Sequence, residues 1–151
     1  MLRKDLDDAL KQAMKARDTR SVSTLRLILA ALKDRDIAAR GKGKPEGLSH
    51  DEILQMLQTM IRQRHESIEL YERGGRDDLA TQEAEEIVVI QRFLPRQLEG
   101  EELTSTIERV VAEIGASSLK DMGKIMSRLK ADYAGQMDFA KASQRVKELL
   151  G

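Results

Sequence analysis

Apolar residues recur along the chain with the spacing of amphipathic helices, and no stretch of useful length alternates with the period of a β-strand. The clearest pattern covers residues 49–95, which we interpret as a long helical hairpin turning at Gly74-Gly75, where either glycine can supply the left-handed residue that ends the first arm. Ser49 and Glu52 have the spacing of a capping box. Pro95 should end the second arm, because it lacks an N–H and restricts the residue before it. The pattern therefore predicts two antiparallel helices.

Helical spacing also predicts two helices before this hairpin and three after it. The expected ranges are 2–17, 21–39, 98–114, 118–133 and 138–150. We expect Leu119 and Leu149 on the inner faces of the last two helices. The linker 40–47 contains three basic residues, but it is rich in Gly and Pro and lacks the spacing of a phosphate loop, so we interpret it as a solvated loop.

Pro95 divides this series of helices. We predict an all-α protein with an N-terminal four-helix lobe, residues 1–95, built on the long hairpin, and a small three-helix C-terminal tail domain, residues 96–151. The tail is short enough to have a thin core. Pro95 is then the expected hinge between the two domains.

Charged residues interrupt the apolar stripes of the hairpin. Arg64 lies within the stripe of the first arm, and Glu83 and Glu86 lie within the stripe of the second. Antiparallel folding about the turn brings Arg64 opposite Glu86. An unpaired charge there would be costly, so we predict a structural ion pair of Arg64 with Glu83 and Glu86 that sets the helix register. A functional site is the less favoured interpretation.

Composition narrows the classes of protein. The chain has 151 residues, of which 34% are charged and 3% aromatic, with a net charge of zero. There is no Cys, which excludes disulfides, thiolate metal ligands and a cysteine nucleophile. No apolar run reaches the length of a membrane span, and the N-terminal residues have no signal-peptide pattern. We therefore expect a soluble, cytoplasmic protein with no membrane partner.

Two separated motifs resemble the GatB/YqeY family, and the resemblance covers essentially the whole chain. The first motif comprises Arg62-Gln63-Arg64, Ser67-Ile68, Tyr71, Gly75-Arg76-Asp77-Asp78-Leu79, Glu83, Glu86-Ile87 and Phe93-Leu94-Pro95. The second comprises Gly115-Ala116-Ser117-Ser118 and Asp121-Met122-Gly123-Lys124-Ile125-Met126. One departure is that Gln136 stands where relatives often carry Arg before the last helix, which removes a basic residue.

The resemblance implies a tRNA-associated helical module. In the B subunit of the tRNA-dependent amidotransferase, the similar helical and tail regions embrace the tRNA, while the chemistry occurs in other domains. That enzyme is a carbon–nitrogen ligase that takes its amido nitrogen from glutamine. The resemblance therefore predicts a non-catalytic tRNA-binding or tRNA-amidation accessory, with tRNA as partner and possible contact with an aminoacyl-tRNA or an amidotransferase component.

A basic surface in the tail supports this interpretation. Residues 117–147 contain seven basic and three acidic side chains. The basic ones, our candidate RNA-binding residues, are Lys120, Lys124, Arg128, Lys130, Lys141, Arg145 and Lys147. The first three recur every four residues, as a row that a phosphate backbone can meet. Because aromatic residues are few, we expect contacts to the phosphates and shape of folded RNA rather than base stacking. DNA is not a predicted partner.

Catalytic patterns are weak. His50 and His65 do not share a helix face, so no helical metal pair is present, and Ser117-Ser118 reads as a helix cap. We nominate no catalytic residue, metal ligand or cofactor. Two alternatives to tRNA binding stay open: a protein-interaction adaptor that docks an acidic partner on the basic tail face, and an amidase-like enzyme acting on aminoacyl-tRNA.

Overall fold

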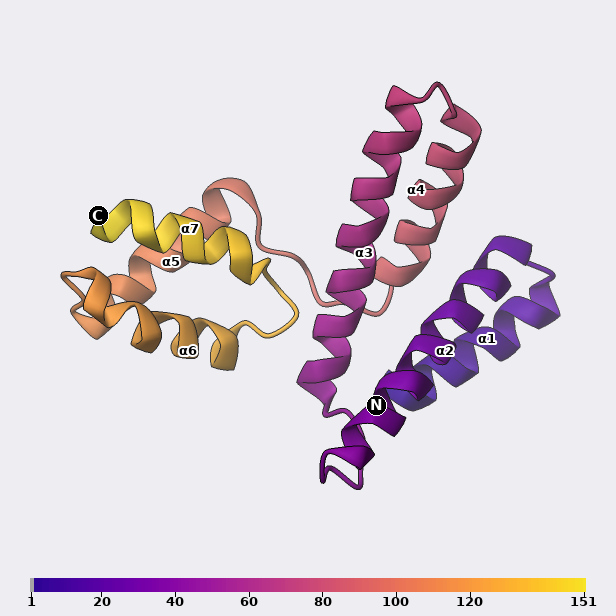
Figure 1. The fold of residues 1–151 in the computed structure, drawn as a ribbon, viewed down its shortest axis with the longest axis horizontal. Helices are drawn as coiled ribbons and strands as arrows, with labels where there is room; N and C mark the ends of the chain where they lie inside the picture. Colours follow the sequence, from indigo (N-terminus) through magenta and orange to yellow (C-terminus); the bar gives the residue numbers. More distant parts are fainter. Residues whose placement is uncertain (1) are drawn as a thin grey trace. The chain divides into compact units, whose positions relative to one another are not determined.

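The computed structural model describes residues 2–151 and divides the chain into two compact units, residues 2–94 and 95–151. Every regular element within residues 2–151 is helical, which confirms the all-α class (Figure 1). The elements are α1 (Leu2–Ala16), α2 (Thr19–Gly41), α3 (His50–Arg73), α4 (Asp77–Gln91), α5 (Gly100–Ile114), the 3₁₀ turn η1 (Leu119–Asp121), α6 (Met122–Asp132) and α7 (Phe139–Leu150).

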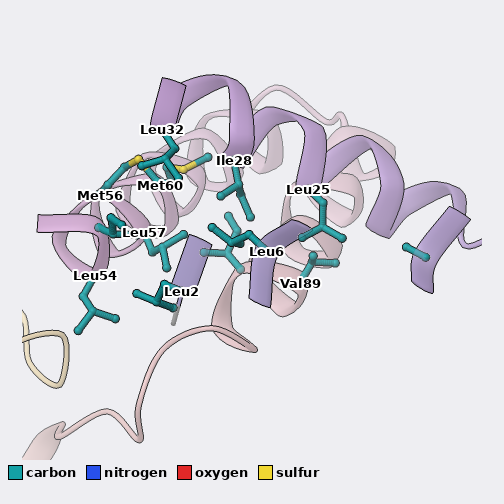
Figure 2. Close-up of a cluster of buried hydrophobic side chains, with 13 residues drawn as sticks. Leu2, Leu6, Leu25, Ile28, Leu32, Leu54, Met56, Leu57, Met60 and Val89 are labelled. Carbon is teal, nitrogen blue, oxygen red and sulfur yellow. The ribbon is translucent and has the colours of Figure 1, made fainter. Parts of the chain in front are cut away.

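The first unit is built from two helical hairpins. Helices α1 and α2 pack together, α3 packs along α4, and α2 also contacts α4 (Figure 1). Figure 2 shows Leu25, Ile28 and Leu32 pointing from one side of α2 into the shared core, where Leu6 and Leu57 meet them. Ile28, Leu6 and Leu57 are fully buried. Each such side chain contributes about 1.5–3 kcal/mol to stability through burial.

The predicted start of α3 and the predicted glycine turn of the hairpin are confirmed. Ser49 accepts a hydrogen bond from the Glu52 N–H, and the Glu52 carboxylate accepts one from the Ser49 N–H, which completes the capping box. Lys44 also binds Glu52, at 2.9 Å. These bonds, that of Lys44 first, lower the pKa of Glu52 to about 2. Gly75 has a φ of 72° and supplies the left-handed residue of the turn.

Helix α4 ends at Gln91, three residues earlier than predicted. The next three N–H groups bond three residues back instead of four, as in the donation of Leu94 to Gln91 O at 3.1 Å. This tighter winding follows from Pro95, which disfavours a helical conformation at Leu94.

The second unit packs α5, α6 and α7 against one another around its own core. Val110, Ile125 and Val146 are fully buried, each from a different helix. Gly115 ends α5 with a φ of 73°, and Ser118 and Asp121 form the second capping box. This unit therefore has a core that involves no side chain from residues 2–94.

Predictions about inward-facing residues were wrong at Leu119 and Leu149 and also at Met14, which is 51% exposed on α1. Leu119 is 53% exposed, because it lies in the 3₁₀ turn η1 and is out of phase with the inner face of α6. Leu149 is 45% exposed in the last turn of α7, where Val146 fills the core. Conversely, Met137, in the loop before α7, is fully buried.

Candidate nucleic-acid interface

The seven predicted RNA-binding residues all lie in the second unit, on η1, α6 and α7, and fall into two groups. Five lysines are exposed, and none of them forms an ion pair within residues 2–151. They are Lys120, Lys124, Lys130, Lys141 and Lys147. The two arginines, Arg128 and Arg145, are engaged inside the unit instead. The two groups therefore have different chemistry.

Arg128 joins α6 to α5. Its Nη2 lies 2.9 Å from Glu113 Oε2, and its Nε donates to Asp132 Oδ2 at 2.7 Å. Glu113 also binds Arg109 at 2.9 Å, and Arg109 in turn contacts the hydroxyl of Tyr133. The hydrogen bond to Asp132, followed by its charge, raises the pKa of Arg128. Two carboxylates therefore already neutralise Arg128.

Arg145 joins α7 to the start of α5. Its Nη1 donates to the Gly100 carbonyl oxygen at 2.6 Å and also to the Thr104 hydroxyl. The side chain is only half-exposed. Arg145 therefore helps to hold α7 against α5. This role depends on how the helices pack, so the spacing of residues near Arg145 in the sequence does not predict it.

The predicted row of Lys120, Lys124 and Arg128 does not lie on one continuous α-helix. Lys120 lies in η1, so the helical repeat begins only at Lys124. Lys130 follows Lys124 by six residues, about 120° around α6, and Lys141 and Lys147 are separated in the same way on α7. The lysines thus spread over the solvent side of α6 and α7.

Acidic residues gather on α5, which separates charge within the unit. Glu99, Glu101, Glu102, Glu108 and Glu113 lie on this helix or at its cap, and all are exposed. Glu102 pairs with Arg96, and Glu113 with two arginines. An anionic ligand would therefore meet the α6 and α7 side of the unit and be repelled by α5.

The hairpin contains the predicted ion pair. Arg64 Nε lies 2.9 Å from Glu86 Oε2 and 3.9 Å from Glu83 Oε2, and its Nη1 donates to Met60 O. The side chains of Arg64 and Glu86 are 13% and 8% exposed. Burial, and next the charge of Glu86, raise the pKa of Glu83. One cation thus faces two carboxylates, and we keep a structural role for the cluster as a prediction.

A second buried polar cluster was missed. Asp36 is 6% exposed on α2, and its carboxylate accepts two hydrogen bonds from the guanidinium of Arg3, at 2.5 and 2.8 Å. The same carboxylate accepts from Leu48 N at 2.8 Å, while Arg3 donates to Leu48 O at 2.9 Å. A signal for it existed, because Asp36 follows Leu32 by four residues and so falls within the apolar stripe of α2.

The two histidines lie apart from each other along α3. His50 and His65 are both exposed, on the first turn and the middle of α3. Among residues 2–151, no group of three or more His, Asp or Glu side chains is placed to hold a metal ion. None of the helices within the same residues combines the length and apolar character needed to cross a membrane.

Together, the helical fold and the lysine-rich surface define an all-α protein of two helical units with a cationic face on the second. The sequence profile of one family, described as Yqey-like protein, matches residues 3–150. The chain belongs to the Yqey-like protein family. This membership confirms the resemblance to the GatB/YqeY family.

Several similar proteins carry the name altered inheritance of mitochondria protein 41, mitochondrial. The relative from Lachancea thermotolerans is 31% identical over 148 residues, covering 92% of this chain and 76% of the relative. The relative from Eremothecium gossypii is 35% identical over 89 residues, covering 59% of this chain and 46% of its own length. That from Saccharomyces cerevisiae is 34% identical over 85 residues, with shares of 56% and 44%. The last two matches thus span less than half of the relatives.

These names correct one prediction. We expected a cytoplasmic protein from the lack of a signal-peptide pattern and of an apolar span. The relatives are named as mitochondrial proteins, so a simply cytoplasmic assignment is wrong for this family. The physical reason for the error is that composition and charge report on solubility and not on the compartment.

Proposed function

We propose that the protein is a tRNA-associated helical module, with a non-catalytic role as a tRNA-binding or tRNA-amidation accessory. Membership of the family supports a relation to the C-terminal region of the amidotransferase B subunit. The observation that carries the proposal is the set of five exposed lysines without ion pairs on the second unit. They are Lys120, Lys124, Lys130, Lys141 and Lys147.

Unpaired lysines suit this role physically. A lysine that pairs with no carboxylate can neutralise a phosphate without first breaking an internal ion pair, and it releases a condensed counterion when it does so. Arg128 and Arg145 would have to give up contacts inside the unit. We therefore place the phosphate contacts on the lysines and remove the two arginines from the proposed RNA-binding set.

A titration tests the proposal. Fluorescently labelled tRNA is titrated with the full chain and with the double variant Lys120→Glu/Lys124→Glu at several salt concentrations. Binding should weaken at least about tenfold, and the salt dependence should fall by about 1 per lost phosphate contact. A matched control, Lys11→Glu/Lys15→Glu on α1, makes the same change in net charge on another helix.

A comparison of lysine and arginine variants tests whether the phosphate contacts come from the lysines. Lys124→Gln should weaken tRNA binding more than Arg128→Gln, since Arg128 is already neutralised. No detectable binding at low salt, or an equal loss in the α1 control, would refute the tail as an RNA surface. Incubation with charged tRNA and glutamine separately tests the amidase-like alternative, for which we expect no turnover.

A further inference from the structure

The outer face of α2 carries a second cationic surface, in the first unit. Arg26, Lys33 and Arg40 are spaced seven residues apart, so consecutive members lie about 10.5 Å apart along the helix and all three lie within about 40° around it. All three are exposed, and none forms an ion pair within residues 2–151. The buried side of α2, shown by Leu25 and Leu32 in Figure 2, points away from them.

Apolar and small side chains lie beside this row. Ile37 is 56% exposed and follows Ala30 by seven residues, and Leu27, 49% exposed, borders the same face. Ala30 and Ile37 thus form a heptad row parallel to the cations. One carboxylate, Asp34, lies at the edge beside Leu27 and pairs with none of the three cations.

This pattern has the form of one half of a helix–helix interface. Two helices that cross at a shallow angle meet along positions that repeat every seven residues. Ala30 allows close approach, Ile37 supplies apolar contact, and the cations select the sign of charge on the partner. A phosphate backbone would make use of the cations but gain nothing from an exposed isoleucine, so the combination favours protein over RNA.

We infer that the outer face of α2, defined by Arg26, Ala30, Lys33, Ile37 and Arg40, docks an amphipathic helix of a partner protein that carries acidic side chains at heptad spacing. Residues 2–47 contain twelve basic and seven acidic side chains, so the whole α1–α2 hairpin attracts such a partner. This surface lies in the first unit and is independent of the lysines proposed to contact tRNA.

A synthetic helix serves as the probe. The peptide spans three heptads, with leucine at one heptad position and glutamate three residues later, and its control has the same composition in shuffled order. Anisotropy of the labelled peptide is measured against the full chain. We expect the ordered peptide to bind saturably and the shuffled peptide not to bind. The affinity of the ordered peptide should fall at least about tenfold for Arg26→Gln/Lys33→Gln and at least about threefold for Ile37→Ser.

Matched variants distinguish binding at this face of α2 from a general effect of net charge. Arg35 is exposed on α2 but lies about 160° around the helix from Lys33, and Met14 is 51% exposed on α1. Arg35→Gln and Met14→Ser should leave peptide affinity within about twofold. Circular dichroism checks that each variant is folded. A charge swap, in which Arg26→Glu/Lys33→Glu is measured against a lysine-bearing peptide, should restore binding.

Three results would overturn the inference. One is equal binding of the ordered and shuffled peptides. The second is an affinity that falls as much in Arg35→Gln as in Lys33→Gln. The third is that an RNA duplex, but not the peptide, binds this face and depends on Lys33 while ignoring Ile37, which would assign the surface to nucleic acid.

Discussion

Arg3 and Asp36 form a two-pronged ion pair between the first turn of α1 and the C-terminal half of α2, with both oxygens of the carboxylate occupied by the guanidinium. The pair also binds both backbone groups of Leu48, in the loop before α3. Three segments far apart in sequence thus meet at one carboxylate. Such a cluster is expected to matter for stability, because removing one partner leaves polar groups of the others without their acceptor or donor.

We expect Asp36→Ala to lower the free energy of unfolding by about 2–4 kcal/mol, since it leaves Arg3 and the Leu48 N–H without their acceptor. Urea denaturation followed by circular dichroism measures the change. Asp34→Ala is the matched control, because Asp34 is exposed on the same helix, and it should change stability by no more than about 0.5 kcal/mol. Equal effects of the two substitutions would show that the cluster contributes nothing.

The stability contribution of Asp36 should vanish in acid. Hydrogen bonds from Arg3, and next that from Leu48, lower the pKa of Asp36 to about 2, from 3.8 in the unfolded chain. A lowered carboxyl pKa gives stability that is complete above about pH 5 and is lost as the pH falls towards 2. Arg3 is partly in solvent, so we expect about 1–2 kcal/mol.

The measurement for this pH effect is the difference between the original chain and Asp36→Asn. Glu52 titrates in the same range with the same sign, and subtraction removes its contribution. The gap in unfolding free energy should narrow between pH 5 and pH 2.5. A gap that stays constant would contradict the proposed linkage.

Substitutions within the Arg64 cluster should change stability in opposite directions. Arg64→Ala leaves the buried Glu86 and the half-buried Glu83 without their cation and should cost about 3–5 kcal/mol. Glu83→Gln should be neutral or stabilising at pH 7, because burial and Glu86 raise the pKa of Glu83 and penalise its charged form. By the same linkage, the benefit of Glu83→Gln should shrink as the pH falls through the range where Glu83 takes up a proton.

Thermal and urea unfolding of Arg64→Ala, Glu83→Gln and Glu86→Gln test this ordering. Glu86→Gln belongs with the destabilising changes, since Glu86 makes the 2.9 Å contact. A destabilisation by Glu83→Gln as large as that by Glu86→Gln would refute the idea of one surplus carboxylate.

Arg145 should act on structure and Lys141 should not. Arg145→Ala removes the hydrogen bonds to Gly100 and Thr104 and should lower local stability by about 1–2 kcal/mol. The side chain of Lys141 is exposed and forms no ion pair, so Lys141→Ala should lower stability by less than about 0.5 kcal/mol. Amide hydrogen exchange in the full chain measures this effect. In Arg145→Ala, exchange should be faster at the N-terminus of α5 and in α7. Identical exchange in the two variants would remove the anchoring role of Arg145.

Sequence reasoning succeeded where the determining contacts are local. The capping boxes at Ser49 and Ser118 depend on residues three apart, and the left-handed ends at Gly75 and Gly115 depend on one residue each. The Arg64–Glu86 pair was within reach because an antiparallel hairpin fixes which residues face each other.

Reasoning from the sequence failed where contacts depend on how separate helices pack. Nothing local to Arg128 indicates Glu113, fifteen residues away on α5, and nothing near Arg145 indicates Gly100. Helical spacing alone therefore overstated the row of free cations. The spacing of α2 could have indicated that Asp36 is buried, but it could not indicate the partner Arg3, which lies on another helix.

The Asp36 cluster restricts which amino acids positions 47 and 48 can accept, and it does so differently at the two positions. A Cβ at position 47 would overlap Asp36 Oδ1, and Gly47 has a φ of 77°, so both the available space and the backbone conformation disfavour any other amino acid there. Leu48 is held through its backbone N–H and C=O, which any residue except proline can offer. The entry to α3 is thus specified by a missing side chain and a distant carboxylate, while position 48 needs only an apolar side chain that fits the core.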